Sequence, residues 1–348
     1  MNNSTCSRRS LVKGMAGAAT FAIVGGLGLA GCGDPAAKAD GSAPSDAAFK
    51  IGVLQLTEHP ALDAANKGFV AAVEEAGIGA AFNQQNAQND QSACQTIASK
   101  LVNDGVDLIF AIATPAAQAV AGAVENAGLE IPVVGSAITD FAASGLVKDN
   151  DAPGGNVTGT SDMNPVVDQI DLLHQLAPEA KKVGLLYCTA ESNSKIQIEL
   201  AAAELKKLGI EGVEYTASSS NEVQQVVESM MGKVDAIYTP TDNTIASAMT
   251  VIASIANEHK VPTVCGEVAH VEAGGLASLS INYEELGRRA GEMAVRILTE
   301  GAEPAAMPIE SMGAAECDLV YNGRTAEALG IDVTSLVEDG ATDVSAAE

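Results

Sequence analysis

Apolar positions along this chain alternate between short continuous runs and longer segments with helical spacing. The run Phe49–Leu56 is almost entirely apolar, as expected for a strand that is buried on both faces of a sheet. Apolar residues in Ala61–Ala76 then recur every three to four positions, and the segment ends at Gly77, a typical helix stop. The alternation continues with predicted strands at 80–84, 106–113 and 131–136 and predicted helices at 90–104 and 115–127. This order predicts a doubly wound parallel sheet.

A second series of alternating predicted strands and helices, similar in length to the first, begins near Lys182. Strands are predicted at 183–187, 213–216, 234–239, 261–265 and 276–281, and helices at 193–208, 220–231, 243–259 and 284–299. Two sets of similar size predict an α/β protein with two doubly wound parallel-sheet lobes. We expect three crossings between the lobes, at Val157–Asp162, Ser280–Asn282 and Pro308–Met312.

The N-terminal segment has the pattern of an export signal. Arg8 and Arg9 precede an apolar run from Met15 to Ala30, and small residues lead directly to Cys32. The arginine pair resembles a twin-arginine signal, with the general export route as the alternative, and Leu-Ala-Gly-Cys resembles a bacterial lipobox. The resemblance implies that residues 1–31 are removed and that Cys32 is lipidated; the alternative is a plain signal peptide with a chance cysteine.

The remaining chain is divided by composition and by the predicted crossings. Residues 32–48 are rich in Gly, Ala, Ser, Asp and Pro and are predicted to be a flexible tether. The first lobe is expected to comprise 49–160 and 283–308, and the second 161–282 and 309–332. The acidic stretch 333–348 is expected to be a frayed tail.

Composition narrows the possible functions. A formal net charge of −26 is unsuited to binding DNA, RNA or anionic lipid headgroups. Aromatic residues make up 3% of the chain and Trp is absent, which weighs against a sugar cleft walled by stacked indoles. The six cysteines form no CxxC pair and no metal-type spacing, so we expect no metal; whether any disulfide forms stays open.

Polar side chains follow the predicted strands, and ligands of open parallel sheets bind outside the carboxyl ends of the strands. In two facing lobes these ends meet across a cleft. The candidate ligand-binding residues lie there or at the crossings: Thr57, Glu58, Thr114, Asp140, Thr160, Ser161, Asp242, Asn243, Glu267 and Asn282. His59, Asp162 and Tyr283 neighbour them, and His59, beside Pro60, is interpreted as a loop residue.

This chemistry suits a zwitterion such as an amino acid. Thr114, with the amides of the helix that it opens, could bind a carboxylate. Asp242 and Glu267 could accept hydrogen bonds from an ammonium group. Each residue also has a purely structural interpretation: Thr114, Asp140, Asp242 and Asn243 could be helix or turn caps, and Glu58 and Glu267 could be solvated loop acids.

Four segments carry a family resemblance that spans roughly Phe49 to Leu329. They are Ile51–Asp63 (IGVLQLTEHPALD), Ala111–Gln118 (AIATPAAQ), Gly154–Asp162 (GGNVTGTSD) and Tyr238–Thr244 (YTPTDNT). With them the chain resembles the ABC-transporter substrate-binding proteins that serve tryptophan- and tyrosine-type importers. The resemblance implies a type I periplasmic-binding-protein fold, aromatic amino acids as ligands, and cleft positions at Thr57, Glu58, Thr114, Thr160, Ser161, Asp242 and Asn243. Glu267 and Asn282 depart from the family pattern and leave the identity of the ligand open.

We therefore expect a lipid-anchored binding protein on the outer face of the cytoplasmic membrane. Its expected partners are a small amino-acid-like ligand and an ABC permease with its ATPase, and we expect a monomer with no cofactor and no bound nucleic acid. An enzyme is disfavoured because the chain has no GxSxG, HExxH or Walker sequence. The alternatives are the input subunit of a sensor system and an importer subunit for a sugar or nucleoside.

Overall fold

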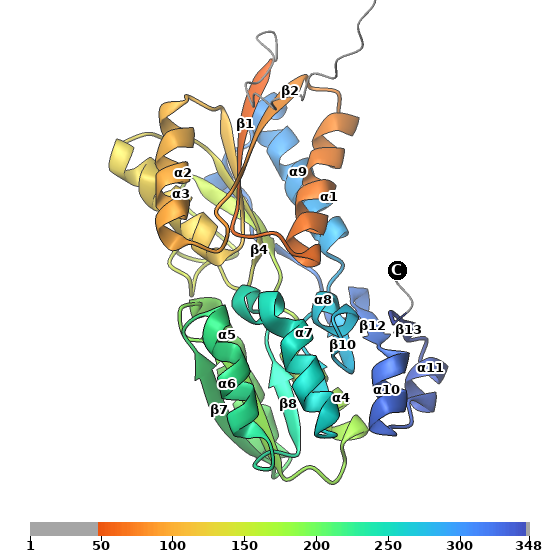
Figure 1. Cartoon of the computed structure of the whole chain (residues 1–348). Coiled ribbons are helices and arrows are strands. Elements are labelled where there is room, and N and C mark those ends of the chain that lie inside the picture. Colours follow the sequence, from red (N-terminus) through yellow and green to blue (C-terminus); the bar gives the residue numbers. More distant parts are fainter. Residues whose placement is uncertain (1–47, 346–348) are drawn as a thin grey trace, which may run out of the picture. The chain divides into compact units, whose positions relative to one another are not determined.

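The computed structural model describes residues 48–345 (Figure 1). The predicted export signal, Cys32 and nearly all of the predicted tether lie outside these residues. The described part contains two α/β lobes, each built on one sheet, as the sequence predicts. The chain passes between the lobes three times: after β5, between β10 and α9, and between β11 and β12.

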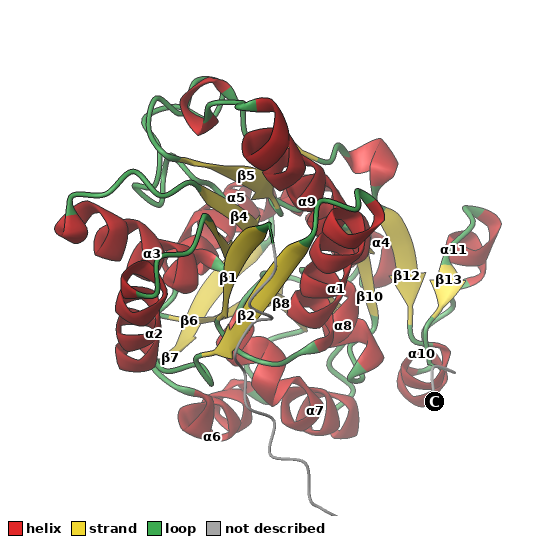
Figure 2. Cartoon of the chain, turned by 90° about the horizontal axis from the view of Figure 1, so that it is seen from above, coloured by secondary structure: helices red, strands yellow, loops and turns green. Residues whose placement is uncertain are grey.

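The first lobe contains a six-stranded sheet in the order β11-β5-β4-β3-β1-β2, in which every neighbouring pair is parallel. Its strands are β1 (Phe49–Gln55), β2 (Ala80–Asn86), β3 (Leu108–Ile112), β4 (Val133–Ile138), β5 (Val157–Ser161) and β11 (Glu310–Ser311). Its helices are α1 (Pro60–Glu75), α2 (Gln91–Asn103), α3 (Thr114–Ala127), α9 (Tyr283–Glu300) and the 3-10 turn η1 (Pro304–Ala306). Helices α1 and α9 pack together on one face of the sheet, and α2 and α3 on the other (Figure 2).

The second lobe contains a seven-stranded sheet in the order β13-β12-β10-β9-β8-β6-β7. Its strands are β6 (Lys182–Cys188), β7 (Glu211–Ala217), β8 (Ala236–Thr239), β9 (Thr263–Cys265), β10 (Ala277–Ser280), β12 (Asp318–Tyr321) and β13 (Thr342–Asp343). Its helices are α4 (Val166–Leu176), α5 (Ser192–Lys207), α6 (Ser220–Met230), α7 (Asn243–Glu258), α8 (Val268–Glu272), α10 (Gly323–Leu329) and α11 (Thr334–Glu338). The 3-10 turn η2 (Ala314–Glu316) lies on the third crossing. Strand β12 runs antiparallel to β10, so this sheet is mixed rather than purely parallel.

Alternating side chains of each strand fill two core layers, one on each face of the sheet. In the second lobe, Ala236 and Tyr238 of β8 pack with α4 and α5, whereas Ile237 packs with α6 and α7. In the first lobe, Phe69 of α1 stacks on Phe110 of β3 with ring centroids 3.7 Å apart. These layers hold the strands in register, so the loops at their carboxyl ends occupy defined positions.

Two predicted boundaries differ from the structure. Residues 309–332 were assigned to the second lobe, but Glu310 and Ser311 pair with Thr160 and Ser161 at the edge of the first sheet. The predicted frayed tail contains α11 and β13, and Leu336 is buried in the core of the second lobe. The backbone N–H of Val344 also donates to the carbonyl of Tyr321. Pairing through backbone groups leaves little trace in a short polar sequence, which explains both differences.

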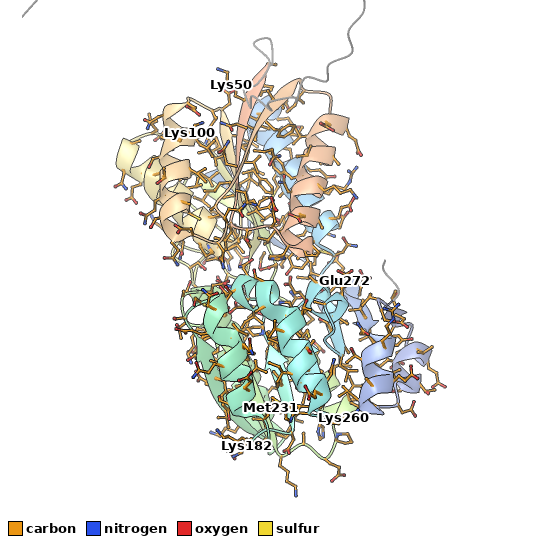
Figure 3. The ribbon with its side chains drawn as sticks, viewed as in Figure 1. Lys50, Lys100, Lys182, Met231, Lys260 and Glu272 are labelled. Carbon is orange, nitrogen blue, oxygen red and sulfur yellow. The ribbon has the colours of Figure 1, made fainter. Side chains whose placement is uncertain are left out.

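Lysines at the amino ends of the strands mark the outer ends of the lobes. Lys50 is the second residue of β1 and Lys182 the first of β6, and Figure 3 shows them at opposite ends of the two-lobed part of the chain. The carboxyl ends of the strands therefore point toward the other lobe. This arrangement brings the loops after β1, β3 and β4 close to the loops after β6, β8 and β9.

Candidate functional site

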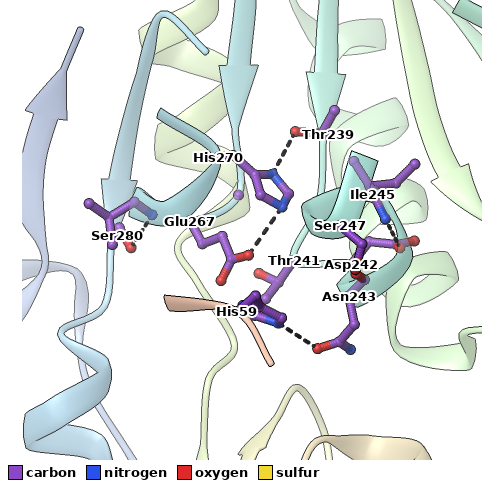
Figure 4. Close-up of polar contacts among 12 residues, drawn as sticks. His59, Thr239, Thr241, Asp242, Asn243, Ile245, Ser247, Glu267, His270 and Ser280 are labelled. Carbon is purple, nitrogen blue, oxygen red and sulfur yellow. Dashed lines mark hydrogen bonds and ion pairs between the residues drawn. The ribbon is translucent and has the colours of Figure 1, made fainter. Parts of the chain in front are cut away.

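Direct hydrogen bonds join the two lobes at these loops. His59, between β1 and α1, places its Nε2 3.0 Å from Oδ1 of Asn243, the first residue of α7 (Figure 4). Gln197 of α5 donates to Thr139 Oγ1 over 3.4 Å. Both pairs are buried, so the lobes meet here through a polar interface from which solvent is largely excluded.

Glu191 fixes the start of α7 at this interface. Its carboxylate accepts hydrogen bonds from the backbone N–H and side-chain Nδ2 of Asn243 and from the backbone N–H and hydroxyl of Thr244, at 2.7–3.1 Å. A carboxylate at a helix N-terminus is favoured by the free amides and the helix dipole. Because Glu191 already occupies these amides, the start of α7 has no free anion-binding groups for a ligand carboxylate.

Two further carboxylates, Asp162 and Glu267, are buried beside the crossings. Tyr283 donates its hydroxyl to Oδ2 of Asp162 over 3.0 Å. Glu267 Oε1 lies 3.1 Å from His270 Nε2, an ion-pair distance although the angle is not that of a hydrogen bond. His270 Nδ1 in turn lies 3.1 Å from the hydroxyl of Thr239, which orients the imidazole (Figure 4).

The two carboxyl groups titrate differently. Burial, with a smaller contribution from the charge of Glu267, raises the pKa of Asp162 from 3.8 to about 7, although hydrogen bonds from Tyr283 and Thr139 oppose the rise. Burial also raises the pKa of Glu267, but interactions with the neighbouring His270 and His59 outweigh burial, and the net pKa is lowered. Glu267 is therefore favoured in its ionised form, whereas Asp162 tends to keep its proton up to about neutral pH, and both present oxygen acceptors at this point of the interface.

Several buried polar atoms at the interface have no hydrogen-bond partner among the described residues. They include Nδ1 of His59, Oγ1 of Thr114 and Oδ1 of Asp162. A buried polar group without a partner costs about 1–3 kcal/mol, so native proteins rarely leave one unsatisfied. Atoms of this kind from sequence-distant loops indicate a place where a polar ligand completes the hydrogen bonding.

The backbone is strained at the same edge of the first lobe. Ala113 has φ +83° and Ala137 has φ +56°, a region that residues other than Gly seldom adopt. Ala113 directly precedes α3 and presents Thr114 at the start of that helix. Strain of this kind is concentrated at functional sites, where the surrounding structure maintains it.

A cavity of about 370 Å³ opens between the lobes beside the starts of α3 and α7. The first lobe contributes apolar and amide side chains, and the second contributes carboxylate and hydroxyl groups; the lining residues are Leu56, Gln88, Asn89, Gln91, Pro115, Ala190, Glu191, Ser218, Ser219, Ser220 and Thr244. This volume is within the range of pockets that hold small ligands. Pro115 and Glu191 connect the cavity to the polar interface.

Three of the residues predicted from sequence lie at this interface as buried groups. Thr114 presents an unpartnered hydroxyl, Asn243 contacts His59, and Glu267 pairs with His270. Thr57 is also buried, at the end of β1, where its carbonyl accepts a hydrogen bond from Gln55. Thr57, Thr114, Asn243 and Glu267 are thus all buried just beyond the carboxyl ends of strands, two in each lobe.

Other predicted residues have structural partners within one lobe. Asp140 caps the turn that follows it by accepting from the N–H of Ala143, and Asn282 caps α9 by accepting from the N–H of Glu285. Thr160 donates to the carbonyl of Leu286 and lies within hydrogen-bond distance of the Ser136 hydroxyl, which can donate to it, and Ser161 donates to the carbonyl of Thr139. Asn282 is exposed, so the structure places it as a helix cap at the surface.

Asp242 and Glu58 also differ from the ligand contacts expected of them. Asp242 is buried, and its carboxylate accepts hydrogen bonds from the backbone N–H of Ile245 and Cys188 and from the hydroxyl of Ser194. Burial and the neighbouring Glu191 charge raise its pKa well above the ordinary value. Through these hydrogen bonds Asp242 joins α5 to α7 inside the second lobe. The Glu58 side chain, in contrast, is exposed.

Sequence reasoning missed Glu191 and His270 and set His59 aside. Glu191 follows β6 by three residues, so the rule that polar residues after strands form the cleft could have included it. His59 also follows β1, but its position beside Pro60 favoured a loop interpretation. Only the structure shows that its partner is Asn243, 184 residues further along the chain.

The described residues contain no cluster of three or more His, Cys, Asp or Glu side chains that could bind a metal ion. Within 48–345, four cysteines are free, and three of them are buried. No helix in this part of the chain combines the length and apolar character that a membrane span requires.

The chain belongs to the family described as "ABC transporter substrate binding protein", whose sequence pattern matches residues 50–345. This membership confirms the predicted resemblance, and the family consists of solute-binding proteins rather than enzymes. The chain is 42% identical over 324 residues to the tyrosine-binding protein of Clostridioides difficile strain R20291, covering 90% of this chain and 92% of that protein.

Solved structures agree in fold. A Streptococcus pneumoniae ABC domain in complex with L-Trp is 40% identical, with a TM-score of 0.80 over 84% of this chain and 99% of that one. A ligand-free, open substrate-binding protein with adhesive properties from Clostridium difficile is 44% identical, with a TM-score of 0.63 over 82% and 95%. A leucine-binding protein of Thermotoga maritima, 14% identical with a TM-score of 0.58 over 78% of this chain and 93% of that one, shares the fold alone. The fold is that of type I periplasmic binding proteins.

Proposed function

We propose that this protein captures an aromatic amino acid between its lobes and delivers it to the permease of an ABC importer. The observation that carries the proposal is the set of unpartnered, buried polar atoms at the lobe interface. They are contributed by both lobes and by the first crossing, so a single bound molecule could satisfy them only when the lobes are close together. A ligand that stabilises the closed state through such contacts shifts the protein toward that state.

The interface matches the two charged ends of an amino acid. Asp162 and Glu267 provide acceptors for an ammonium group, and hydrogen bonds between charged groups are the stronger ones. Thr114 provides a hydroxyl at the N-terminus of the 14-residue helix α3, whose amides favour a carboxylate. Because Glu191 occupies the start of α7, α3 is the better helix for the ligand carboxylate.

The relatives support an aromatic side chain. One is a tyrosine-binding protein and another was solved with L-Trp. The described lobes superpose better on the L-Trp complex than on the ligand-free, open structure, although the open structure has the higher sequence identity. Sequence divergence would give the opposite order of TM-scores. A lobe arrangement close to that of the L-Trp complex explains the higher TM-score.

Membrane attachment is part of the same proposal. The basic start, the apolar run and the Leu-Ala-Gly-Cys sequence support export and lipidation at Cys32, although these residues lie outside the described part. The binding protein would then work on the outer face of the cytoplasmic membrane. Mass spectrometry of the protein from membranes tests this point, since it should find a diacylated N-terminal Cys32.

A thermal-shift screen tests the ligand class. A soluble form that begins at Gly33 would be heated with each amino acid and with representative purines, nucleosides and sugars. A ligand at 100 times its Kd stabilises the folded state by about 2.7 kcal/mol, which should raise Tm by roughly 5 °C. We expect shifts for L-tyrosine, L-tryptophan or L-phenylalanine. A shift confined to a sugar or nucleoside would refute the proposal.

A further inference from the structure

The two ring nitrogens of His59 have different surroundings. Nε2 lies 3.0 Å from Asn243 Oδ1 in the opposite lobe. Nδ1 is buried and has no hydrogen-bond partner among the described residues. The imidazole as a whole is only 9% exposed, so neither nitrogen can rely on bulk water. One nitrogen therefore joins the lobes, and the other is buried without a partner among the described residues.

The neighbouring side chains determine which nitrogen carries the proton. Asn243 Nδ2 donates to Glu191 Oε2 over 2.7 Å, so the amide oxygen of Asn243 must face His59. A carbonyl oxygen only accepts hydrogen bonds, and consequently Nε2 of His59 must be the N–H donor. In the neutral ring, Nδ1 is then an acceptor with a free lone pair. Glu191 thus sets the tautomer of a residue in the other lobe.

The groups around this acceptor are also acceptors. His59 lies close enough to Glu267 to affect the pKa of that carboxyl. Glu267 in turn acts on Asp162, whose Oδ1 has no partner. An acceptor Nδ1 and the oxygens of two neighbouring carboxyl groups favour a group with several N–H donors. A primary ammonium has three such donors.

We propose that His59 accepts a hydrogen bond from the ligand's ammonium group through Nδ1 while its Nε2 holds the second lobe through Asn243. This inference rests on the proposed function and adds a residue that couples ligand capture to lobe closure. Nδ1 of His59 is an acceptor for the ammonium group only in the tautomer that carries its proton on Nε2. The contact of Nε2 with Asn243 of the other lobe favours this tautomer. When the lobes separate, Nε2 loses Asn243 and nothing keeps Nδ1 in its acceptor form.

Two near-isosteric substitutions separate the roles of the nitrogens. His59→Gln places an amide N–H near the position of Nε2, so it can keep the contact with Asn243 but has no acceptor at the Nδ1 position. His59→Asn places an amide oxygen near the position of Nδ1, so it keeps an acceptor there and loses the contact between lobes. Thermal unfolding of both variants shows first that each is folded.

Binding would be measured with L-tryptophan and with indole-3-propionate, which is the same molecule without the ammonium group. Since the chain has no Trp, the fluorescence of the indole reports binding directly. The quantity of interest is the preference for L-tryptophan, defined as the ratio of the two Kd values. We expect His59→Gln to reduce this preference by roughly ten- to a hundredfold, as for a lost hydrogen bond to a charged group.

His59→Asn should weaken both ligands by a similar factor and leave the preference within about threefold of the wild type, since a closure defect affects both ligands alike. An unchanged preference in His59→Gln would overturn the inference. If the wild-type protein binds neither L-tryptophan nor L-tyrosine, the proposed function itself fails, and this outcome is distinct from the previous one.

Discussion

Tyr283 donates its hydroxyl to Asp162 over 3.0 Å, and each residue lies beside a different crossing between the lobes. Asp162 follows β5 and Tyr283 begins α9, so the bond connects the first crossing to the second. It leaves the other oxygen of Asp162 unpartnered and buried. The crossings therefore join the lobes and also position a carboxylate at the place where the ligand ammonium is expected.

The raised pKa of Asp162 predicts how stability depends on pH. With a folded pKa of about 7 against an ordinary 3.8, the folded state holds a proton that the unfolded chain releases. The resulting stabilisation is complete below about pH 4 and is lost as the pH rises through about 7. The free energy of unfolding of the ligand-free protein should fall over this range more steeply than that of Asp162→Asn, as measured by urea denaturation. Parallel pH profiles for the two proteins would contradict the prediction.

Two buried threonines predicted from sequence should respond differently to the same substitution. The hydroxyl of Thr114 has no partner in the described structure, so Thr114→Val should leave Tm of the ligand-free protein unchanged or higher and weaken amino-acid binding about tenfold. Thr160 donates within the first lobe, so Thr160→Val should lower the free energy of unfolding by about 1–2 kcal/mol. Calorimetric titration and thermal unfolding of both variants measure the two effects. Equal affinity in Thr114→Val and the wild type would remove Thr114 from the site.

Asp242→Ala should primarily affect stability. Sequence reasoning alone predicts at least tenfold weaker binding without unfolding, because Asp242 was expected to contact the ligand. In the structure the substitution removes the cap of α7 and leaves the N–H of Cys188 and the hydroxyl of Ser194 without an acceptor. We expect a loss of about 3 kcal/mol in the free energy of unfolding, measured with urea. Glu58→Ala, at an exposed side chain, is the control and should change neither quantity.

Helices α1 and α9 approach closely because Gly68 has no side chain. A Cβ at this position would lie 1.9 Å from the carbonyl oxygen of Glu284, at the start of α9. Gly68→Ala should therefore push the helices apart and lower the free energy of unfolding by about 3 kcal/mol. Gly122→Ala in α3 is the matched control, since a Cβ there meets no atom within 4 Å and should stabilise by about 0.5–1 kcal/mol. Thermal unfolding compares the two; equal Tm values would show that α1 and α9 can adjust.

Much of the architecture follows from local pattern. The apolar runs predicted most of the strands of both sheets, and periodic segments ending in Gly predicted most of the long helices. Helix α4 is not predicted, because the second set of alternating segments is recognisable only from about Lys182 onward. Strands β11 and β13 were missed because each has only two residues and pairs through the backbone. Hydrophobic spacing cannot reveal elements that bury so little apolar surface.

The candidate site was predicted in position but not in detail. The rule that ligands bind beyond the carboxyl ends of parallel strands placed polar residues at the lobe interface. It did not separate Asp162, which has an unpartnered oxygen, from Asp242, whose carboxylate accepts three hydrogen bonds. Both are buried aspartates that follow a strand, and their difference arises from partners elsewhere in the chain.

The sequence by itself determined the two-lobed alternation of strands and helices, the family and the edge of each sheet where polar residues gather, since these depend on residues close together in the chain. Only the tertiary structure decided which polar atoms are satisfied and which remain available, as for Asp162 and Tyr283, 121 residues apart. Hydrogen bonding in a buried interface depends on distance and angle between groups that folding brings together, and neither quantity is encoded in local spacing.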